Sequence, residues 1–327
     1  MSKYLITGIT GFAGPHLANL LIEQGHTVYG LVRNSNGRET DILDVVPEKN
    51  FQKIKFVYGD LTNYLSIDKV FETNLFDGVF HLAAQSHPPT SFTDPIGTFN
   101  ANIMGSAHLI QAIEKYQPEC KLMFCSTSEV YGNVGIDGRK IKTDDTLLPA
   151  NPYGASKAAT DLYLQERFEN KKIRGFITRA FSHTGPRRGK TFSISSDAFQ
   201  IAKMKLGMQE PVLQVGNLKS VRVVLDVRDI VNAYYLLMIN DKSDGNIYNV
   251  SGNTPHEMGY YTDLLIKQAD LKVEVQKVIS DKLFRPIDIH YQHGDCQSLI
   301  DLTGWRPYYG LEATMQDLLE YWVNKLR

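Results

Sequence analysis

The sequence is poor in cysteine, has no excess of charge of either sign and contains no long apolar run. Its 327 residues include three cysteines and carry a formal net charge of −1. Because the cysteines lack the spacing of a metal site, we expect buried thiols, no metal and a reduced, cytoplasmic setting. The balanced charge argues against a nucleic-acid surface, and no run approaches the roughly 18 apolar residues of a membrane span. The start, MSKYLITG, is strand-like and leaves no room for a signal peptide.

Short apolar runs alternate with longer helical patterns over the first half of the chain. The runs are rich in β-branched and aromatic residues, which favours strands at Lys3–Thr7, Thr27–Val32, Ile54–Tyr58, Gly78–Leu82, Lys121–Ser126 and Arg174–Arg179. Patterns with helical spacing lie between them, at Pro15–Gln24, Ser66–Thr73, Thr98–Tyr116 and Tyr153–Asn170. The alternation predicts an α/β fold with a doubly wound parallel sheet of the Rossmann type, covered by helices on both faces.

Three glycines link the first predicted strand to the first predicted helix. Gly8, Gly11 and Gly14 let the backbone turn tightly and approach a pyrophosphate. The start of the helix then offers free N–H groups and the positive end of its dipole. This placement predicts a dinucleotide site that includes Phe12 and Ala13.

The end of the second strand indicates which dinucleotide is bound. Arg33 and Asn34 stand where NAD-preferring sites usually have an acidic residue for the ribose hydroxyl, and a guanidinium suits a 2′-phosphate. We therefore expect NADP, with NAD as the alternative. Asp60 and Leu61 follow the third strand and are predicted to flank the adenine ring, although Asp60 is also a candidate helix N-cap.

The pattern changes after about residue 180, where glycine, proline, arginine and serine become frequent. We expect residues 1–180 to form the NAD(P)-binding Rossmann domain and residues 181–327 to form mainly a smaller α/β substrate-binding lobe. The apolar run Ile247–Val250 is predicted to return to the Rossmann sheet as a strand.

Tyr153 and Lys157 lie four residues apart at the start of a predicted helix, which puts both side chains on one face. A tyrosine with its usual pKa of about 10 is a poor base, but a neighbouring ammonium and a positive nicotinamide would lower that pKa. The pair could then take a proton from a sugar hydroxyl while hydride leaves the same carbon.

Two polar residues stand at the end of the fifth strand, where ligands lie in open α/β sheets. Thr127 is placed to hydrogen-bond the hydroxyl that Tyr153 deprotonates. Glu129 follows two residues later. Simple hydride transfer needs no carboxylate there, whereas removal of a carbon-bound proton does. The alternative for Glu129 is a structural carboxylate in a turn or helix start.

These motifs resemble the extended short-chain dehydrogenase/reductase family of nucleotide-sugar-modifying enzymes over almost the whole chain. Within that family the sequence is most similar to GDP-mannose 4,6-dehydratases and the related GDP-heptose dehydratases. The closer resemblance is carried by Gln85-Ser86-His87, by Thr127-Ser128-Glu129 and by the run from His183 to Gly189.

The resemblance implies a lyase that oxidises carbon 4 of the sugar, eliminates water across carbons 5 and 6 and recycles its bound NADP. It implies Tyr153, Lys157 and Thr127 for the first step and Glu129 for the carbon-5 proton. Ser128 stands where some dehydratases have an aspartate, so Glu129 is expected to serve as both base and acid. Further cofactor contacts are implied for Leu82, Ala83, Ala84, His183 and Arg188.

The resemblance also implies a GDP-sugar substrate. The residues implied to contact it are Gln85, Ser86, Thr127, Ser182, Arg187, Val215, Asn217, Arg222 and Arg285. Arginines suit a nucleoside diphosphate, and Arg187 or Arg188 is implied near the active site or the cofactor of a neighbouring subunit. Ser182 and Val223 depart from the family's usual Asn and Asp, which leaves the sugar open between mannose and a manno-heptose.

Two other reactions fit the same residues. A GDP-4-keto-6-deoxy-sugar reductase shares the glycine loop and the Tyr153–Lys157 pair, and some such reductases keep a glutamate near the Glu129 position. A nucleotide-sugar 4-epimerase needs no carbon-5 base, so Glu129 disfavours that reaction. Because members of the family form dimers, we expect a homodimer or homotetramer that associates through Thr98–Tyr116 and Tyr153–Asn170.

Overall fold

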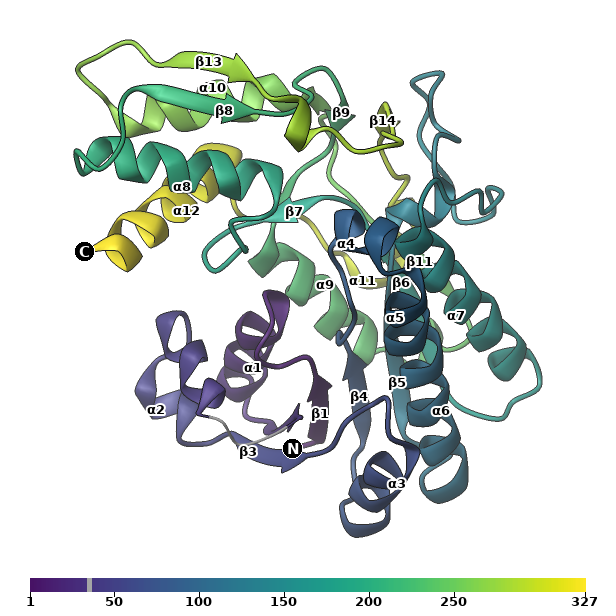
Figure 1. Cartoon of the computed structure of the whole chain (residues 1–327). Helices are drawn as coiled ribbons and strands as arrows, with labels where there is room; N and C mark the ends of the chain where they lie inside the picture. Colours follow the sequence, from purple (N-terminus) through teal and green to yellow (C-terminus); the bar gives the residue numbers. More distant parts are fainter. Residues whose placement is uncertain (34–36) are drawn as a thin grey trace.

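The computed structural model describes residues 1–33 and 37–327, and its centre is a seven-stranded sheet of order β11-β6-β5-β4-β1-β2-β3 (Figure 1). Every pairing between these strands is parallel. The strands are β1 Lys3–Thr7, β2 Thr27–Val32, β3 Lys55–Tyr58, β4 Gly78–His81, β5 Lys121–Thr127, β6 Gly175–Ala180 and β11 Ile247–Val250. All begin and end within one residue of the predicted bounds, and the Rossmann-type fold is confirmed.

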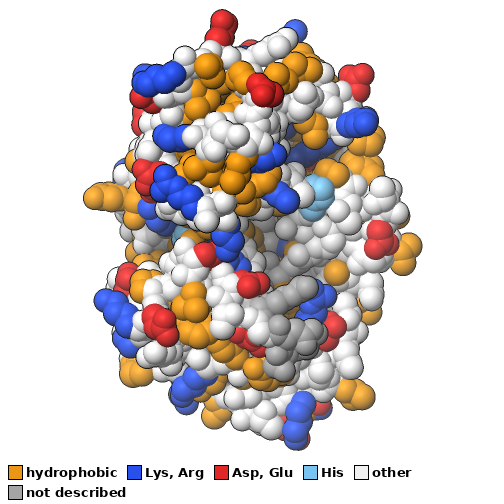
Figure 2. Space-filling model, turned by 60° about the vertical axis from the view of Figure 1, so that its left-hand side comes forward, with side chains coloured by type: hydrophobic (Ala, Val, Ile, Leu, Met, Phe, Trp, Pro, Cys, Tyr) orange, Lys and Arg blue, Asp and Glu red, His pale blue; other side chains and the backbone are white. Residues whose placement is uncertain are grey.

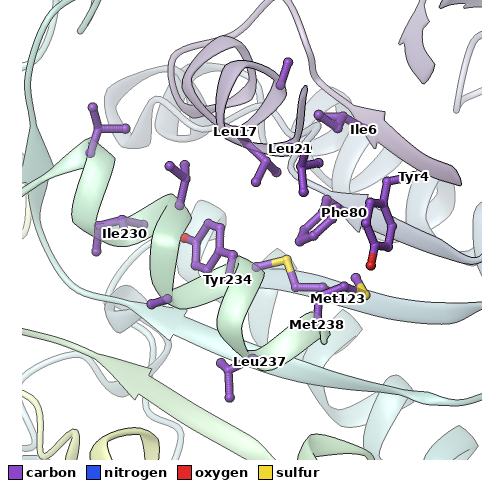
Figure 3. Packing of buried hydrophobic residues seen from close by; sticks show 14 of the residues in the cluster. Tyr4, Ile6, Leu17, Leu21, Phe80, Met123, Ile230, Tyr234, Leu237 and Met238 are labelled. Atoms are coloured by element: carbon purple, nitrogen blue, oxygen red, sulfur yellow. The ribbon is translucent and has the colours of Figure 1, made fainter. Parts of the chain in front are cut away.

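Helices cover both faces of this sheet. The longer ones are α1 Ala13–Glu23, α3 Tyr64–Thr73, α6 Gly105–Tyr116, α7 Pro152–Glu169 and α9 Val227–Met238. Helices α1 and α9 pack on one face, where Leu17 and Leu237 lie in one cluster with Ile6 (Figure 3). Helices α3, α6 and α7 pack on the other face, where Leu109 lies in one cluster with Leu5. Neighbouring residues of β1 thus enter opposite cores, as the alternation of side chains along a strand requires.

The predicted helix Thr98–Tyr116 is interrupted in the structure. It consists of α5 Pro95–Phe99, the π-helical segment η2 Asn100–Met104 and α6. A π-turn inside a helix often marks a functional site, and the sequence pattern, which has a period of 3.6 residues, gave no sign of it. Shorter helical segments are η1 Arg38–Asp44, α2 Glu48–Phe51, α4 Pro88–Thr93, η3 Ser128–Tyr131, η4 Asp241–Ser243, η5 Asp281–Leu283 and α11 Gln297–Thr303.

The C-terminal lobe has a hydrophobic core of its own. It is built from α8 Ser193–Lys205, β8 Val212–Val215, α10 Met258–Ala269, β13 Gln276–Ile279 and α12 Leu311–Leu326. Two-residue strands connect it to the sheet domain: β7 His183–Thr184, β9 Val221–Arg222, β10 Leu225–Asp226, β12 His256–Glu257 and β14 Tyr291–Gln292. Figure 2 shows that the surface is hollowed between this lobe and the sheet domain, with Lys and Arg side chains along the border of the hollow.

None of the helices within residues 1–33 and 37–327 combines the length and the apolar character of a membrane span.

Candidate active site

The loop between β1 and α1 forms a cradle that only glycine permits. Gly8 has a φ of +75°, and a Cβ atom there would lie 2.8 Å from the backbone nitrogen of Ala83. A Cβ atom on Gly14 would lie 2.7 Å from the Cα atom of Ile9. Helix α1 begins at Ala13 and has no side-chain cap hydrogen bond at its N-terminus. This geometry fits a pyrophosphate.

The end of β4 closes the other side of this cradle. The Thr7 hydroxyl accepts a hydrogen bond from the N–H of Ala83 and contacts Nδ1 of His81 at 2.7 Å. Burial lowers the pKa of His81 to about 3, so the ring stays neutral. Leu82, Ala83 and Ala84 are half-buried beside the loop, and their contacts with the cofactor stay a prediction.

The residues predicted to bind the adenosine half of the cofactor are described by the structure except for Asn34. Arg33 is exposed at the end of β2, where a cation can meet a phosphate, whereas Asn34 lies outside the described residues. The Asp60 carboxylate accepts hydrogen bonds from the N–H and the hydroxyl of Thr62. The alternative of Asp60 as a helix N-cap is wrong, because α3 is capped by Asn63. The carbonyl of Leu61 contacts Nδ1 of His108 at 2.7 Å.

Tyr153 and Lys157 lie in the first turns of α7 and are both buried. Burial raises the pKa of Tyr153, and the hydrogen bond with Thr127 and the charge of Arg188 lower it less. The lowered pKa that we expect requires a bound nicotinamide and stays a prediction. Burial also lowers the pKa of Lys157 to about 8, with its Nζ 4.1 Å from the centre of the Phe124 ring. Without a bound ligand, the site therefore keeps the phenol protonated.

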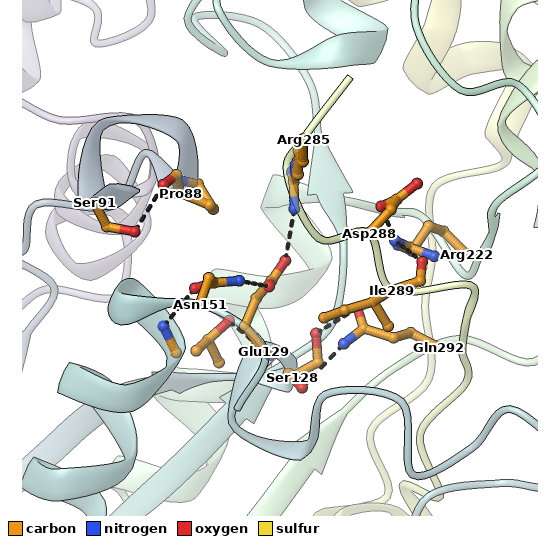
Figure 4. A network of polar contacts seen from close by, with 12 residues as sticks. Pro88, Ser91, Ser128, Glu129, Asn151, Arg222, Arg285, Asp288, Ile289 and Gln292 are labelled. Carbon is orange, nitrogen blue, oxygen red and sulfur yellow. Dashed lines mark hydrogen bonds and ion pairs between the residues drawn. The ribbon is translucent and has the colours of Figure 1, made fainter. Parts of the chain in front are cut away.

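The Glu129 carboxylate is held at both oxygens (Figure 4). Its Oε2 accepts a hydrogen bond from Nδ2 of Asn151 at 2.7 Å, and its Oε1 accepts one from the Arg285 guanidinium at 3.1 Å. The N–H of Glu129 is bonded to Oγ1 of Thr127 at 3.3 Å, and the negative charge of Glu129 contributes to the raised pKa of Tyr153. The structure thus brings Thr127, Glu129 and Tyr153 together as predicted.

Ser128 points away from this group. Its hydroxyl donates to the side-chain oxygen of Gln292, whose amide donates back to the Ser128 carbonyl (Figure 4). Both residues are buried. Our inclusion of Ser128 among the catalytic residues is therefore not supported by its geometry, since its side chain serves this buried contact.

The two neighbouring arginines of the run from His183 to Gly189 differ in their surroundings. Arg187 donates to the carbonyls of Thr10 and Gly11 and forms an ion pair with Asp44. We expected Arg187 on the substrate, but its guanidinium is bound to the glycine loop instead, and its left-handed backbone, with a φ of +76°, turns the chain there.

Arg188 lies toward the reaction centre. Its guanidinium is 4.8 Å from the centre of the Phe12 ring and 3.5 Å from that of Phe192. Burial lowers the pKa of Arg188 to about 10, and the proximity of Tyr153 opposes that shift. The His183 ring stacks on the ring of Phe12, which belongs to the glycine loop, and burial lowers the pKa of His183 to about 4.

Gln85 and Ser86 follow β4 on the side of the catalytic helix. The Gln85 amide is bonded to the Thr98 hydroxyl and to the N–H of His87, so it holds the loop in place. Asn102, in the π-helical segment, ties this loop to α7 through bonds to Gln85 and to the Ser156 hydroxyl. Ser86 is exposed.

The predicted substrate residues of the second half separate into two groups. Arg222 donates to the carbonyl of Ile289 and lies 3.6 Å from Asp288, which also accepts a hydrogen bond from Asn217 (Figure 4). Burial lowers the pKa of Arg222. Val215, in contrast, is buried in the lobe's core, so its side chain does not reach the hollow as we expected.

Ser182 is bonded through its backbone to β10, the strand that pairs with β7. It is half-buried beside β7, and its carbonyl accepts the N–H of Leu225 at 3.0 Å.

The sequence matches the family described as GDP-mannose 4,6 dehydratase over residues 5–318. The chain belongs to this family. It is 29% identical over 325 residues to a GDP-6-deoxy-D-mannose reductase of Pseudomonas aeruginosa, which covers 99% of this chain and 98% of that protein. It is 28% identical over 325 residues to GDP-mannose 4,6 dehydratase 1 of Arabidopsis thaliana, at 97% and 88% coverage. Membership of this family makes the chain an enzyme, as predicted.

A solved structure of a Pseudomonas aeruginosa protein designated RMD, complexed with NADPH, has the same fold. It superposes with a TM-score of 0.82 at 26% identity and covers 99% of this chain and 100% of that chain. The likeness extends over both lobes, so this chain and that structure share the arrangement of sheet domain and C-terminal lobe.

Four residues of the site were missed by the sequence analysis: Asn102, Asn151, Asp288 and Gln292. Asn151 carried a usable signal, because an asparagine directly before a proline at a helix start is a typical N-cap. The other three act across long stretches of sequence: 164 positions separate Gln292 from Ser128. No local pattern predicts such contacts.

Proposed function

We propose that the chain is a nucleotide-sugar 4,6-dehydratase that converts GDP-mannose or a GDP-manno-heptose to the 4-keto-6-deoxy sugar. The observation that carries this proposal is the position of Glu129. Its carboxylate lies in the same pocket of residues as Thr127 and Tyr153 and is held by Asn151 and Arg285. Oxidation at carbon 4 alone would not require this second ionisable group.

We propose NADP as the cofactor. The glycine cradle and the uncapped start of α1 fit the pyrophosphate, and Arg33 suits a 2′-phosphate. When bound, NADP would supply a hydride acceptor for carbon 4, a positive charge near the buried phenol and the hydride for carbon 6.

Tyr153 takes the proton of the 4-hydroxyl in the first step. Because burial raises the pKa of this phenol, it needs nearby positive charge. Arg188 acts on Tyr153 in the structure, and Lys157 lies one turn further along α7. Thr127, hydrogen-bonded to Tyr153, is placed to orient the reacting hydroxyl. The product is a ketone at carbon 4.

Glu129 moves the next two protons. The ketone acidifies carbon 5, so the carboxylate takes the carbon-5 proton and the C–H electrons form the double bond to carbon 6. The C6–O bond breaks at the same time, and the hydroxide takes the proton from Glu129 and leaves as water. When hydride is added to carbon 6, carbon 5 receives a second proton, which Glu129 takes up from solvent and delivers. One carboxylate serves as base and then acid, because Ser128 is turned toward Gln292.

The experiment is to incubate the purified protein with GDP-mannose, or with GDP-manno-heptose, and NADP far below the sugar concentration. We expect mass loss of one water per sugar with no net change in reduced cofactor. Absence of water loss with both sugars would overturn the proposal.

The second candidate is a 4-keto-6-deoxy-sugar reductase, which the Pseudomonas aeruginosa relative favours. It predicts stoichiometric consumption of added NADPH by a GDP-4-keto-6-deoxy sugar and no dehydration of GDP-mannose. A nucleotide-sugar 4-epimerase would change neither mass nor net cofactor.

Association into a homodimer or homotetramer stays a prediction. Leu162 and Tyr163 on α7 leave 56% and 36% of their surfaces exposed, which gives this helix apolar side chains for a second copy. Sedimentation or light scattering of the purified protein would measure the mass of the assembly.

A further inference from the structure

Asn151 makes two contacts that serve different purposes. Its Oδ1 accepts the N–H of Gly154 at 2.7 Å, which caps α7, the helix of Tyr153 and Lys157. Its Nδ2 donates to Oε2 of Glu129 at 2.7 Å. The side chain is buried, with 6% of the residue exposed. Its bond to Gly154 is buried, and its bond to Glu129 (Figure 4) is partly buried.

We propose that Asn151 is a positioning residue for the elimination step, one that fixes the Glu129 carboxylate relative to Tyr153. The inference rests on the proposed function. Capping α7 does not by itself need an amide, because aspartate, serine and threonine cap helices as well. Only an amide accepts from Gly154 with one atom and donates to a carboxylate with the other.

The contact fixes which carboxylate oxygen is available to the substrate. Oε2 is bonded to Asn151, which is part of the rigid start of α7. Oε1 is bonded to Arg285, whose side chain is 31% exposed on a loop of the C-terminal lobe. The amide therefore anchors one oxygen to the helix that orients Tyr153 and leaves the other to meet carbon 5. Base and phenol are thus held by one helix terminus.

The variant Asn151→Asp separates this role from capping. It keeps the size of the side chain and the cap but replaces the N–H donor by an acceptor. Two carboxylates at hydrogen-bond distance favour a shared proton. The other charged or titratable groups that act on Glu129 or are influenced by it are Arg285, Arg222 and Tyr153. They stay unchanged in the variant.

We expect Asn151→Asp to lower kcat for water loss by about 10- to 100-fold and to move the acid limb of its pH profile to higher pH. The KM for GDP-mannose and the rate of first-turnover nicotinamide reduction should stay within about threefold, and the melting temperature should hold because the cap remains. Solvent deuterium at carbon 5 reports the proton transfer directly.

The matched control is Asn63→Asp, the same exchange at the N-cap of α3, which should leave all rates unchanged. Asn151→Ser is the second variant: it keeps a cap without adding charge, and we expect a smaller loss of kcat and an unshifted pH profile.

Parallel loss of nicotinamide reduction and water loss in Asn151→Asp, or wild-type kcat in both Asn151 variants, would overturn the positioning role while the proposed function stands. If the wild-type protein loses no water from either GDP-sugar, the proposed function fails and this inference fails with it.

Discussion

Arg285 and Glu129 form an ion pair at 3.1 Å, although 156 positions separate them in the sequence. Glu129 belongs to the sheet domain and Arg285 to the C-terminal lobe. The same guanidinium is the predicted partner of the substrate's diphosphate. Two anions thus share one cation, and we expect the diphosphate to draw Arg285 from Glu129 when the GDP-sugar binds.

Arg285→Met tests this exchange. Loss of a charge-assisted contact to the diphosphate should raise KM for the GDP-sugar by about 10- to 100-fold. The kcat should fall by less than about threefold, because Glu129 is no longer held by Arg285 in the complex. Steady-state kinetics measure both values. Arg306→Met, an exposed arginine of the C-terminal lobe, is the control, and an unchanged KM in Arg285→Met would contradict the assignment.

The glycine cradle predicts a defect in cofactor binding without loss of the fold. In Gly8→Ala the new methyl group would meet the backbone of Ala83, and the φ of +75° would be strained. We expect NADPH affinity to fall at least about tenfold, as measured by fluorescence titration. Gly25→Ala is matched in backbone, with a φ of +81°, but meets nothing within 4 Å. Gly25→Ala should lower the stability of the fold and leave NADPH affinity unchanged. Equal NADPH affinity in both variants would contradict the proposal that the glycine loop binds the cofactor.

Thr127 should set the pH dependence of the first step. Its hydrogen bond lowers the pKa of Tyr153 against the effect of burial. Removing the hydroxyl in Thr127→Val raises that pKa further. The limb over which the rate rises with pH, which follows formation of the phenolate, therefore moves to higher pH. Single-turnover nicotinamide reduction across pH measures the limb. Thr127→Ser keeps the hydroxyl and should keep the wild-type limb, and identical limbs in the two variants would contradict this role.

Asp197 should make the stability of the protein depend on pH. Burial in the core of the C-terminal lobe raises the pKa of Asp197 to about 7, and its hydrogen bond from Thr262 opposes this shift. A folded-state pKa above the unfolded value of 3.8 means that protonation stabilises the fold. This stabilisation is complete below about pH 4 and is lost as the pH rises through 7.

The melting temperature of Asp197→Asn should therefore exceed that of the wild type by several degrees at about pH 8. At about pH 5 the two melting temperatures should be much closer. Differential scanning calorimetry measures both. Asp263→Asn, an exposed residue of α10, is the control. The same difference from wild type at the two pH values would show that the buried carboxylate does not titrate as expected.

Much of the fold was predictable from local pattern. The strands of the parallel sheet are nearly continuous apolar runs, because both faces are buried, and β1, β2 and β11 begin and end as predicted. The glycine loop was equally predictable, since Gly8 and Gly14 stand where any side chain would collide with backbone. The spacing of Tyr153 and Lys157 also predicted correctly that both lie in the first turns of one helix.

The rest of the site depends on contacts between distant segments. Nothing in the sequence around Ser128 shows that Gln292 will take its hydroxyl, or that Arg187 will be bound by Asp44 and the glycine loop. The resemblance implied that Arg187 and Val215 contact the substrate, but in the structure both side chains are packed against or bonded to other residues of the protein. The rise in the pKa of Tyr153 without a cofactor was not predictable either, because the extent of burial is a property of the packed structure.

Glu129→Gln tests the central claim most directly. The amide keeps the shape of the side chain but cannot take the carbon-5 proton, so water loss from the GDP-sugar should fall at least about 100-fold. Oxidation at carbon 4 should continue for one turnover and leave reduced nicotinamide on the protein, visible by its absorbance. Glu72→Gln, at an exposed position on α3, should behave as wild type. Water loss by Glu129→Gln within about threefold of the wild-type rate would remove Glu129 from the mechanism and contradict the account.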